Sequence, residues 1–313
     1  TDANAETLIA ARNSTATELE EALAAGNVIL SDSNIRVTDV VNKSEAATIN
    51  AYNNISGIVT LTSVSDVLAN VNELAANTEI SIGTADITIT DTTSLLDANT
   101  LNGYTSGEVT LDSVTDTFLN VKEIYGLTPA ADGEDGVNLT AASINIVITD
   151  SVTLQQATEL NTFTTGLVTL NSIKDEYNNL ISIDAISSTE VTMANAEVQV
   201  TDIVDLSKVN ELRSDTTGNV TVEKISEDKS NLSIINAFTD VILSNSNIIV
   251  TNDVSKDEAE AIDGYNDVAG SVTLTSITDD LENVKIINSN SDILIDGALI
   301  TINDVVSLSD VEV

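Results

Sequence analysis

The chain has 313 residues, of which 42% are hydrophobic and only 3% aromatic, so its core must be built from Val, Ile, Leu and Ala. Fifty acidic against 11 basic residues give a formal charge of −39, which disfavours nucleic acid and anionic membranes as partners. Because the chain has no His and no Cys, disulfide frameworks and Ser-His-Asp, Cys-His and His-metal sites are all excluded. No apolar run approaches the ~20 residues that a membrane-spanning helix needs.

One block recurs along the chain, and it consists of a glycine, a strand of the V-T-L type and an acid. It reads GEVTLDSVTD at Gly107, and the other copies begin at Gly57, Gly166, Gly218 and Gly270. Copies that return at a period of about 52 residues indicate a repeat array. We therefore predict a single array over residues 1–313.

Residues 1–27 are predicted to be a partial repeat, because STATELEEALAAGN occupies the place of the second helix of the next repeat. A full repeat then begins with a short first strand at 28–30, a polar corner and a second strand at 35–37. A first helix of ~10 residues follows, as the apolar residues recur at helical spacing. The chain begins without Met and ends within a repeat, which favours a segment of a longer protein.

The repeat is completed by a third strand at 59–61, after Gly57, and a second helix from about Ser65. The same order predicts repeats that start near residues 28, 80, 137, 191 and 241, and a partial repeat at 293–313. An insertion at 127–136 holds the only proline, Pro129, and should project from the surface of the array.

Helix boundaries are indicated by pairs of residues at capping-box spacing. At the first helix these are Asn42 with Glu45, Ser94 with Asp97, Thr153 with Gln156, and Ser255 with Glu258. At the second helix they are Ser63 with Asp66, Ser113 with Asp116, Ser172 with Asp175, and Ser276 with Asp279. In each pair we expect the short side chain to accept from an early helix amide and the longer one to accept from the N-cap amide. The recurring glycine is expected to end the first helix in a left-handed C′ conformation.

Alternating strands and helices, with strands 21 to 28 residues apart, are typical of parallel coils. Because β-α-β crossovers are right-handed, we predict a right-handed α/β solenoid whose parallel sheet is covered by helices. A parallel β-helix with helical decorations is the alternative architecture.

Acidic residues recur at fixed places in the repeat and are the candidate metal ligands. The column after the second strand consists of Asp39, Asp91, Asp150, Asp202 and Asp304, with Asn252 in the fifth place. Stacked carboxylates could share Ca²⁺, which takes six to eight oxygen ligands. The favoured interpretation is that each acid caps its own turn. The insertion acids Asp132, Glu134 and Asp135 are a further calcium candidate.

Threonine also recurs on the strands. By strand alternation, the Thr of each V-T-L run should point outward while Val and Leu point into the core. These threonines are Thr60, Thr110, Thr169, Thr221 and Thr273, and a second column is Thr38, Thr90, Thr149, Thr201 and Thr251. Such a face could order water as on ice-binding solenoids, but Arg36, Val147, Gln199 and Ile249 interrupt it. A polar sheet face is the favoured interpretation.

Basic residues are sparse, and the densest group lies in the fourth repeat. It consists of Lys208, Arg213, Lys224 and Lys229. We expect these side chains to form local ion pairs with Asp205, Glu211 and Asp228 rather than an anion site. No GxGxxG or P-loop pattern occurs, and no acid pair stands out for glycosidase chemistry, so no enzyme activity is predicted.

The runs VTLTSVSDVLANV and ITDTTSLLDANTLNGYTSGEVTL resemble repeats in giant secreted, adhesin-like and motility-associated surface proteins of bacteria, notably marine cyanobacteria. The resemblance covers nearly the whole sequence and implies an extracellular, cell-surface location with a spacer or adhesive role. We therefore expect a non-catalytic array, an acidic rod-like spacer whose neighbours are further repeats or an unknown surface ligand. The alternative is a binding module that holds a glycan, a protein or Ca²⁺ through the sheet face or the 127–136 loop. No cofactor other than Ca²⁺ is expected.

Overall fold

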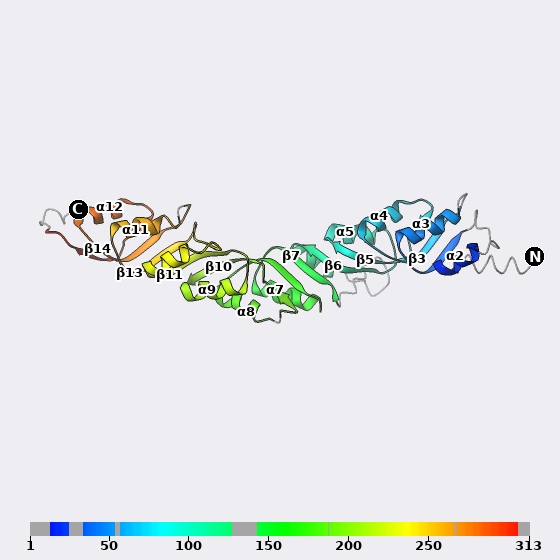
Figure 1. Cartoon of the computed structure of the whole chain (residues 1–313), viewed down its shortest axis with the longest axis horizontal. Helices are drawn as coiled ribbons and strands as arrows, with labels where there is room; N and C mark the ends of the chain where they lie inside the picture. The colour runs from blue at the N-terminus through cyan, green and yellow to red at the C-terminus, as the bar shows by residue number, and fades with distance from the viewer. Residues whose placement is uncertain are drawn as a thin grey trace, which may run out of the picture. The chain divides into compact units, whose positions relative to one another are not determined.

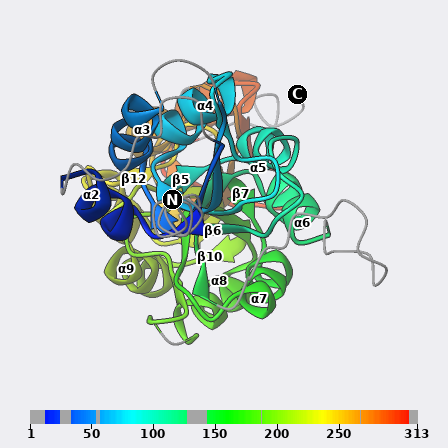
Figure 2. The same ribbon diagram turned by 90° about the vertical axis from the view of Figure 1, so that its right-hand side faces the viewer.

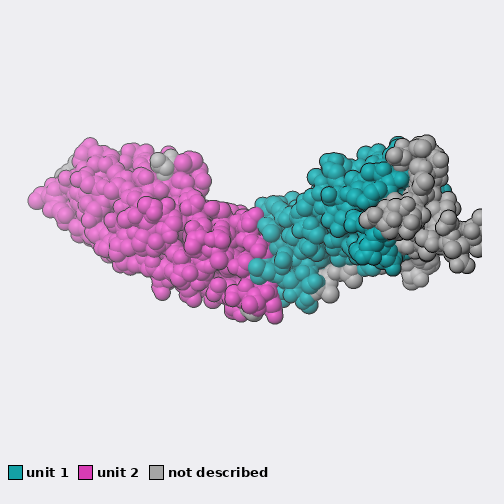
Figure 3. Space-filling model, turned by 45° about the vertical axis from the view of Figure 1, so that its right-hand side comes forward, with its two compact units in different colours: residues 1–149, 160–168 teal, residues 150–159, 169–313 magenta. Residues whose placement is uncertain are grey.

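The computed structural model describes residues 13–24, 34–53, 57–126, 143–186, 188–266 and 268–305. The predicted short strands near 28 and 137, the insertion at 127–136 with Pro129, and its acids Asp132, Glu134 and Asp135 lie outside these ranges. The chain divides into two compact units, Thr1–Thr149 with Leu160–Val168, and Asp150–Glu159 with Thr169–Val313 (Figure 3).

The first unit is a parallel sheet with the strand order β1-β2-β3-β5-β6-β7, in which β4 also pairs with β3. Its strands are β1 (Asn13–Ser14), β2 (Ile35–Val41), β3 (Val59–Asp66), β4 (Ile80–Ser81), β5 (Asp86–Thr93), β6 (Val109–Asp116) and β7 (Asn145–Val152). Its helices are α2 (Ala16–Ala24), α3 (Lys43–Tyr52), α4 (Leu68–Ala76), α5 (Leu95–Asn102) and α6 (Phe118–Gly126). Helices and strands alternate along the chain (Figure 1).

The second unit repeats this arrangement with the strand order β8-β10-β11-β13-β14-β15. In this unit β9 also pairs with β8, β12 pairs with β11, and β16 pairs with β14. The last two of these pairs are parallel. Its strands are β8 (Val168–Asp175), β9 (Val191–Thr192), β10 (Glu197–Val204), β11 (Val220–Glu227), β12 (Val241–Ile242), β13 (Asn247–Val254), β14 (Val272–Asp279), β15 (Ile293–Leu294) and β16 (Leu299–Ile302). Its helices are α8 (Tyr177–Asp184), α9 (Leu206–Asp215), α10 (Lys229–Asn236), α11 (Lys256–Asp263) and α12 (Leu281–Ser289). The unit boundaries fall within α7 (Leu154–Phe163), after Thr149 in β7 and after Val168 at the start of β8.

The predicted α/β solenoid with a parallel sheet covered by helices is confirmed. In β3, Val59, Leu61 and Val64 are fully buried, whereas the threonine between the first two is only partly buried. Each helix buries one stripe, such as Ala46 and Ile49 in α3. Viewed end-on, α3, α4, α5 and α6 of the first unit lie in an arc outside β5 and β6, as expected when neighbouring strands are rotated by the sheet twist (Figure 2).

The predicted strands were too short. The second strand continues past residue 37 to Val41, and the third continues past residue 61 to Asp66. A β-bulge at Thr38–Asp39 shifts the register between Val37 and Val40, so that the buried Val41 pairs with the buried Val64 of β3. Equivalent shifts occur in β5, β10 and β13. Asp39 therefore lies within a strand and not after it.

The short strands form a corner with the second strand that follows them. In the first unit β4 pairs with Val59 and Thr60 at the start of β3, and β5 pairs with the stretch from Ser63 to Asp66 at its end. One eight-residue strand therefore supports both segments, and the chain turns at residues 82–85 between them. The repeat boundaries given above stay a prediction.

Candidate functional site

The acids that end the third strands form the most regular polar contacts in the structure. One Asp66 oxygen accepts from the Lys43 amide of α3 at 2.8 Å, although the two residues are 23 positions apart. The other oxygen accepts from the Val67 amide and from the Asn70 side chain, both at 2.8 Å. Asp66 thus connects the first turn of one helix to the start of the next, and we call such a contact to the preceding coil a cross-coil cap.

Cross-coil caps recur at the other third strands. The acceptor–amide pairs are Asp116 with Leu95, Asp175 with Leu154, Glu227 with Leu206, and Asp279 with Lys256, at 2.8 to 3.0 Å. The aspartates also accept from Asn120, Asn179 and Asn283, four residues further on. The Asp-x-x-x-Asn spacing is a sequence signal that could have indicated this role.

The capping boxes predicted at the second helix are wrong. Ser63 and Asp66 belong to β3, because the strand continues to Asp66 and the helix begins only at Leu68. The same holds for the pairs at Ser113, Ser172 and Ser276. The predicted boxes at the first helix are confirmed, with reciprocal hydrogen bonds at Asn42, Ser94, Thr153 and Ser255.

The candidate calcium ligands in or just after the second strands also act as cross-coil caps. Acceptor–amide pairs are Asp39 with Ala16, Asp91 with Leu68, Asp202 with Tyr177, Asn252 with Lys229, and Asp304 with Leu281, at 2.7 to 3.1 Å. Each acid therefore caps a helix of the preceding coil and not its own turn. Asp150 also has an interaction partner. Asn252 shows that a neutral acceptor satisfies the same amide.

Calcium binding by these acids stays a prediction. Within the described residues, no three Asp, Glu, His or Cys side chains come together in a way that could hold a metal ion. Bonding to a helix amide uses one oxygen of each capping side chain, which leaves fewer lone pairs for a cation.

The capping hydrogen bonds also lower the pKa of the carboxylates that accept them. Burial raises the pKa of Asp66, but hydrogen bonds from the Lys43 amide, the Asn70 side chain and the Val67 amide outweigh burial, so this pKa lies below its ordinary value. At Asp116 hydrogen bonds again outweigh burial and lower the pKa. These carboxylates stay charged near the positive end of a helix dipole.

A second contact between coils was missed by the sequence interpretation. The buried Thr105 hydroxyl donates to the Ala85 carbonyl at 2.6 Å and accepts from the Gly107 amide at 2.8 Å. Thr164 and Thr216 repeat both bonds, to Ile144 with Gly166 and to Ala196 with Gly218. The Asn266 amide group donates to the Ser246 carbonyl in the same way. The recurring Thr-x-Gly before the third strand was the available signal.

The basic residues of the fourth repeat do form ion pairs, but not with the predicted partners. Arg213 pairs with Asp240 at 2.9 Å and lies over the Phe238 ring, and Lys229 pairs with Glu258 at 2.7 Å. Lys208 instead lies 5.0 Å from the centre of the Tyr177 ring. The predicted partner Asp205 is the N-cap of α9. Since neighbouring coils lie side by side, residues about 27 positions apart compete successfully with local partners.

An acidic group on α8 and α9 perturbs the acidity of its own members. The Tyr177 hydroxyl donates to Glu211, and this bond, together with burial and nearby negative charge, raises the pKa of Tyr177 to about 12. Burial and the charges of Asp184 and Glu211 raise the pKa of Asp215. Both groups hold their protons more tightly than usual, as expected where carboxylates gather.

The outward threonines lie where strand alternation placed them. Thr60, Thr110, Thr169, Thr221 and Thr273 are all half-buried beside fully buried Val and Leu. Thr62 and Thr275 donate to the bulge carbonyls of Val37 and Val250 at 2.9 and 2.8 Å. Part of the hydroxyl face therefore satisfies the backbone of the sheet itself.

Comparison with known proteins identifies no relative: no protein-family model, curated protein or solved structure matches the chain. None of the helices in the described ranges has the length and apolar character required to cross a membrane.

Proposed function

We propose that this chain is a non-catalytic structural array that serves as an acidic spacer in a large extracellular surface protein. The observation that carries this proposal is the uniformity of the cross-coil caps. The same hydrogen bond, from the first amide of a helix to a side chain in the next coil, recurs in α2, α3, α4, α5, α7, α8, α9, α10, α11 and α12. Stacked units that each bind only their neighbours can be added or removed without redesign.

The chemistry of the surface is compatible with this role. A charge of −39 keeps a long chain soluble and separates it from other anionic surfaces. The resemblance to giant bacterial surface proteins supports a location outside the cell. There, salt and divalent cations would screen the repulsion between carboxylates.

Deletion of one repeat tests the proposal. Removing residues 191–240 joins Glu190 to Val241. The new junction is equivalent to the original one, because Val191 begins the short strand β9 and Val241 begins the short strand β12 of the following repeat. We expect the shortened chain to fold with unchanged helix content per residue. In small-angle X-ray scattering its maximum dimension should fall by roughly 10 Å, the width of two strands at ~4.8 Å each.

The matched control removes residues 191–215, which joins positions that are not equivalent and should disrupt the stack. If the in-register deletion unfolds the remaining coils, or leaves the maximum dimension unchanged, the chain is not an array of interchangeable spacers.

A further inference from the structure

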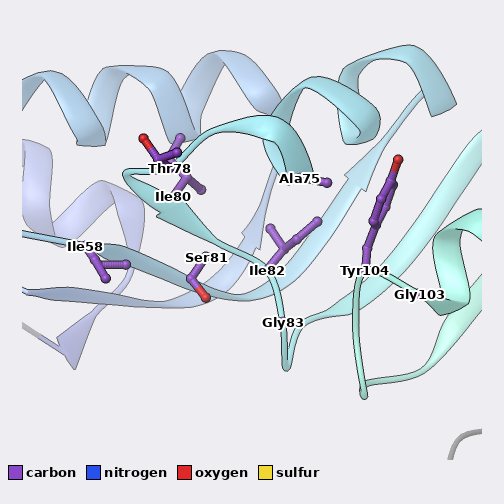
Figure 4. A pocket seen from close by; sticks show the side chains of 9 residues that line it. All are labelled: Ile58, Ala75, Thr78, Ile80, Ser81, Ile82, Gly83, Gly103 and Tyr104. Atoms are coloured by element: carbon purple, nitrogen blue, oxygen red, sulfur yellow. The ribbon is translucent and has the colours of Figure 1, made fainter.

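A cavity of about 420 Å³ lies beside the C-terminal ends of α4 and α5 in the first unit (Figure 4). Its lining includes Ala75 near the end of α4 and Tyr104 just after α5, together with the buried Ile80 of β4 and Ile82 just after that strand. The Tyr104 ring stands at one end of the space, where Figure 4 shows it nearly edge-on. This volume is within the range of small-molecule sites in proteins.

The next repeat shows what fits such a space. Tyr125 is seven residues after the first residue of α6, as Ala75 is in α4. Phe163 is nine residues after the first residue of α7, as Tyr104 is after that of α5. The rings of Tyr125 and Phe163 are stacked, with centroids 4.8 Å apart and 20° between the planes. At the Ala75 position the stacking ring is missing, so the Tyr104 ring lies against a cavity.

The lining determines which ligands the cavity accepts. Its nine residues include the hydroxyls of Thr78 and Ser81 but no acidic or basic side chain. An uncharged ligand is therefore favoured, and the formal charge of −39 disfavours anions. Stacking on Tyr104 favours a planar aromatic ring, and a hydroxyl on that ring would meet the polar rim.

We propose that this cavity binds an uncharged aromatic ring of phenol size, stacked on Tyr104 as Tyr125 is stacked on Phe163. The ring can come from a free phenolic compound or from a tyrosine side chain of a peptide, because the recognised group is the same. This site lies neither on the outward sheet face nor in the 127–136 loop, and its function is separate from the spacer role.

The test is a titration of the full chain with p-cresol, the side-chain analogue of tyrosine, followed by two-dimensional NMR of the backbone amides. We expect saturable shifts at Thr78, Ser81, Gly83 and Gly103, with a Kd on the order of millimolar for so small a ligand. The non-aromatic 4-methylcyclohexanol should bind about fivefold more weakly, which corresponds to the ~1 kcal/mol that stacking adds.

Three variants locate the site. Ala75→Tyr fills the cavity with the protein's own ring and should abolish binding without lowering Tm. Tyr104→Leu keeps the apolar volume but removes the stacking face, so binding should weaken about fivefold. Tyr125→Ala opens the equivalent space against Phe163 and should add a second p-cresol site.

Unchanged p-cresol affinity in folded Ala75→Tyr, or equal affinity for p-cresol and 4-methylcyclohexanol, would overturn the proposal. A capped Gly-Tyr-Gly peptide distinguishes the source of the ring. Binding as strong as that of p-cresol identifies a peptide side chain as the source, and binding of p-cresol alone identifies a free phenol.

Discussion

At the residue scale, a close approach of two coils requires the glycine before four of the third strands, at Gly107, Gly166, Gly218 and Gly270. A Cβ on Gly218 would lie 2.2 Å from the Ala196 carbonyl oxygen, and one on Gly107 would lie 2.3 Å from that of Ala85. The predicted left-handed helix C′ role is wrong. The first helix ends several residues earlier, and among the described glycines only Gly57, Gly270 and Gly297 have positive φ, at 138°, 154° and 83°. The same carbonyls accept the buried threonine hydroxyls, so this corner leaves no room for a methyl group.

Substitution of this glycine should be strongly destabilising. Gly218→Ala forces the backbone of two coils apart, and overpacking of this kind costs ~1–3 kcal/mol. Gly83→Ala is the matched control, because a Cβ at Gly83 meets nothing within 4 Å. Its effect should stay within about 0.5 kcal/mol. Urea denaturation of both variants checks the prediction, and equal stabilities would contradict the steric explanation.

At the element scale, ten of the described helices begin where a neighbouring coil supplies an acceptor. Of the second helices, α4 and α8 have N-caps, Val67 and Glu176, that make no side-chain cap hydrogen bond. Their first amides are satisfied instead by Asp91 and Asp202 from the next coil. Local capping signals could not locate these helix starts, because the acceptor lies 23 or 25 residues away. Helix formation is thereby coupled to the stacking of coils.

Because of the cross-coil caps, the free energy of unfolding should depend on pH in the acidic range. A hydrogen bond from Asn283, followed by one from the Lys256 amide, lowers the pKa of Asp279 in the folded state. A lowered folded-state pKa means that the stabilisation is complete above the unfolded-state value of ~3.9 and is lost as pH falls through the folded-state pKa. Asp279→Asn removes the charge and replaces one of the two acceptor oxygens, which bond the amides of Lys256 and Asp280 and the Asn283 side chain, by a donor. It should therefore cost about 1–2 kcal/mol at pH 7, and this difference from the wild type should shrink below pH 4.

The control for this experiment is Asp296→Asn, which removes the same charge from an exposed residue. It should leave the free energy of unfolding within about 0.5 kcal/mol of the wild type. Chemical denaturation between pH 2 and pH 7 supplies both comparisons. A pH-independent difference for Asp279→Asn would show that its charge does not act through the cap.

At the scale of the whole molecule, repulsion between like charges is a cost that the stacked coils must offset. Fifty acidic residues face 11 basic ones. Several of the described basic residues pair with an acid from another element, as Lys43 does with Glu73 and Lys174 with Glu223. Such exposed pairs contribute little individually. The stability of the chain should therefore respond to the ionic medium more than to any single pair.

Raising the salt concentration should raise Tm, because salt screens the repulsion between the carboxylates. At 0.15 M this screening already limits charge interactions to about 8 Å. Since the capping acids have helix amides as partners, Ca²⁺ and Mg²⁺ at equal ionic strength should shift Tm equally. Differential scanning fluorimetry with chelator, Mg²⁺ and Ca²⁺ checks this. A larger shift with Ca²⁺ would identify a true calcium site, and alanine substitution of Asp132, Glu134 and Asp135 would then test whether the insertion holds it.

The sequence by itself determined the period, the alternation of parallel strands and helices, the buried faces and the capping boxes of the first helix. These features depend on contacts within a few residues, so periodicity and spacing display them directly. Only the tertiary structure decided the strand ends, the bulge at Thr38–Asp39, the partners of Arg213 and Lys229, and the helix amides that Asp66 and Asp91 cap. Each of these depends on residues from neighbouring coils, which come together only when the chain stacks. The cavity at Tyr104 has the same origin, because its walls come from separate coils whose spacing no local pattern reveals.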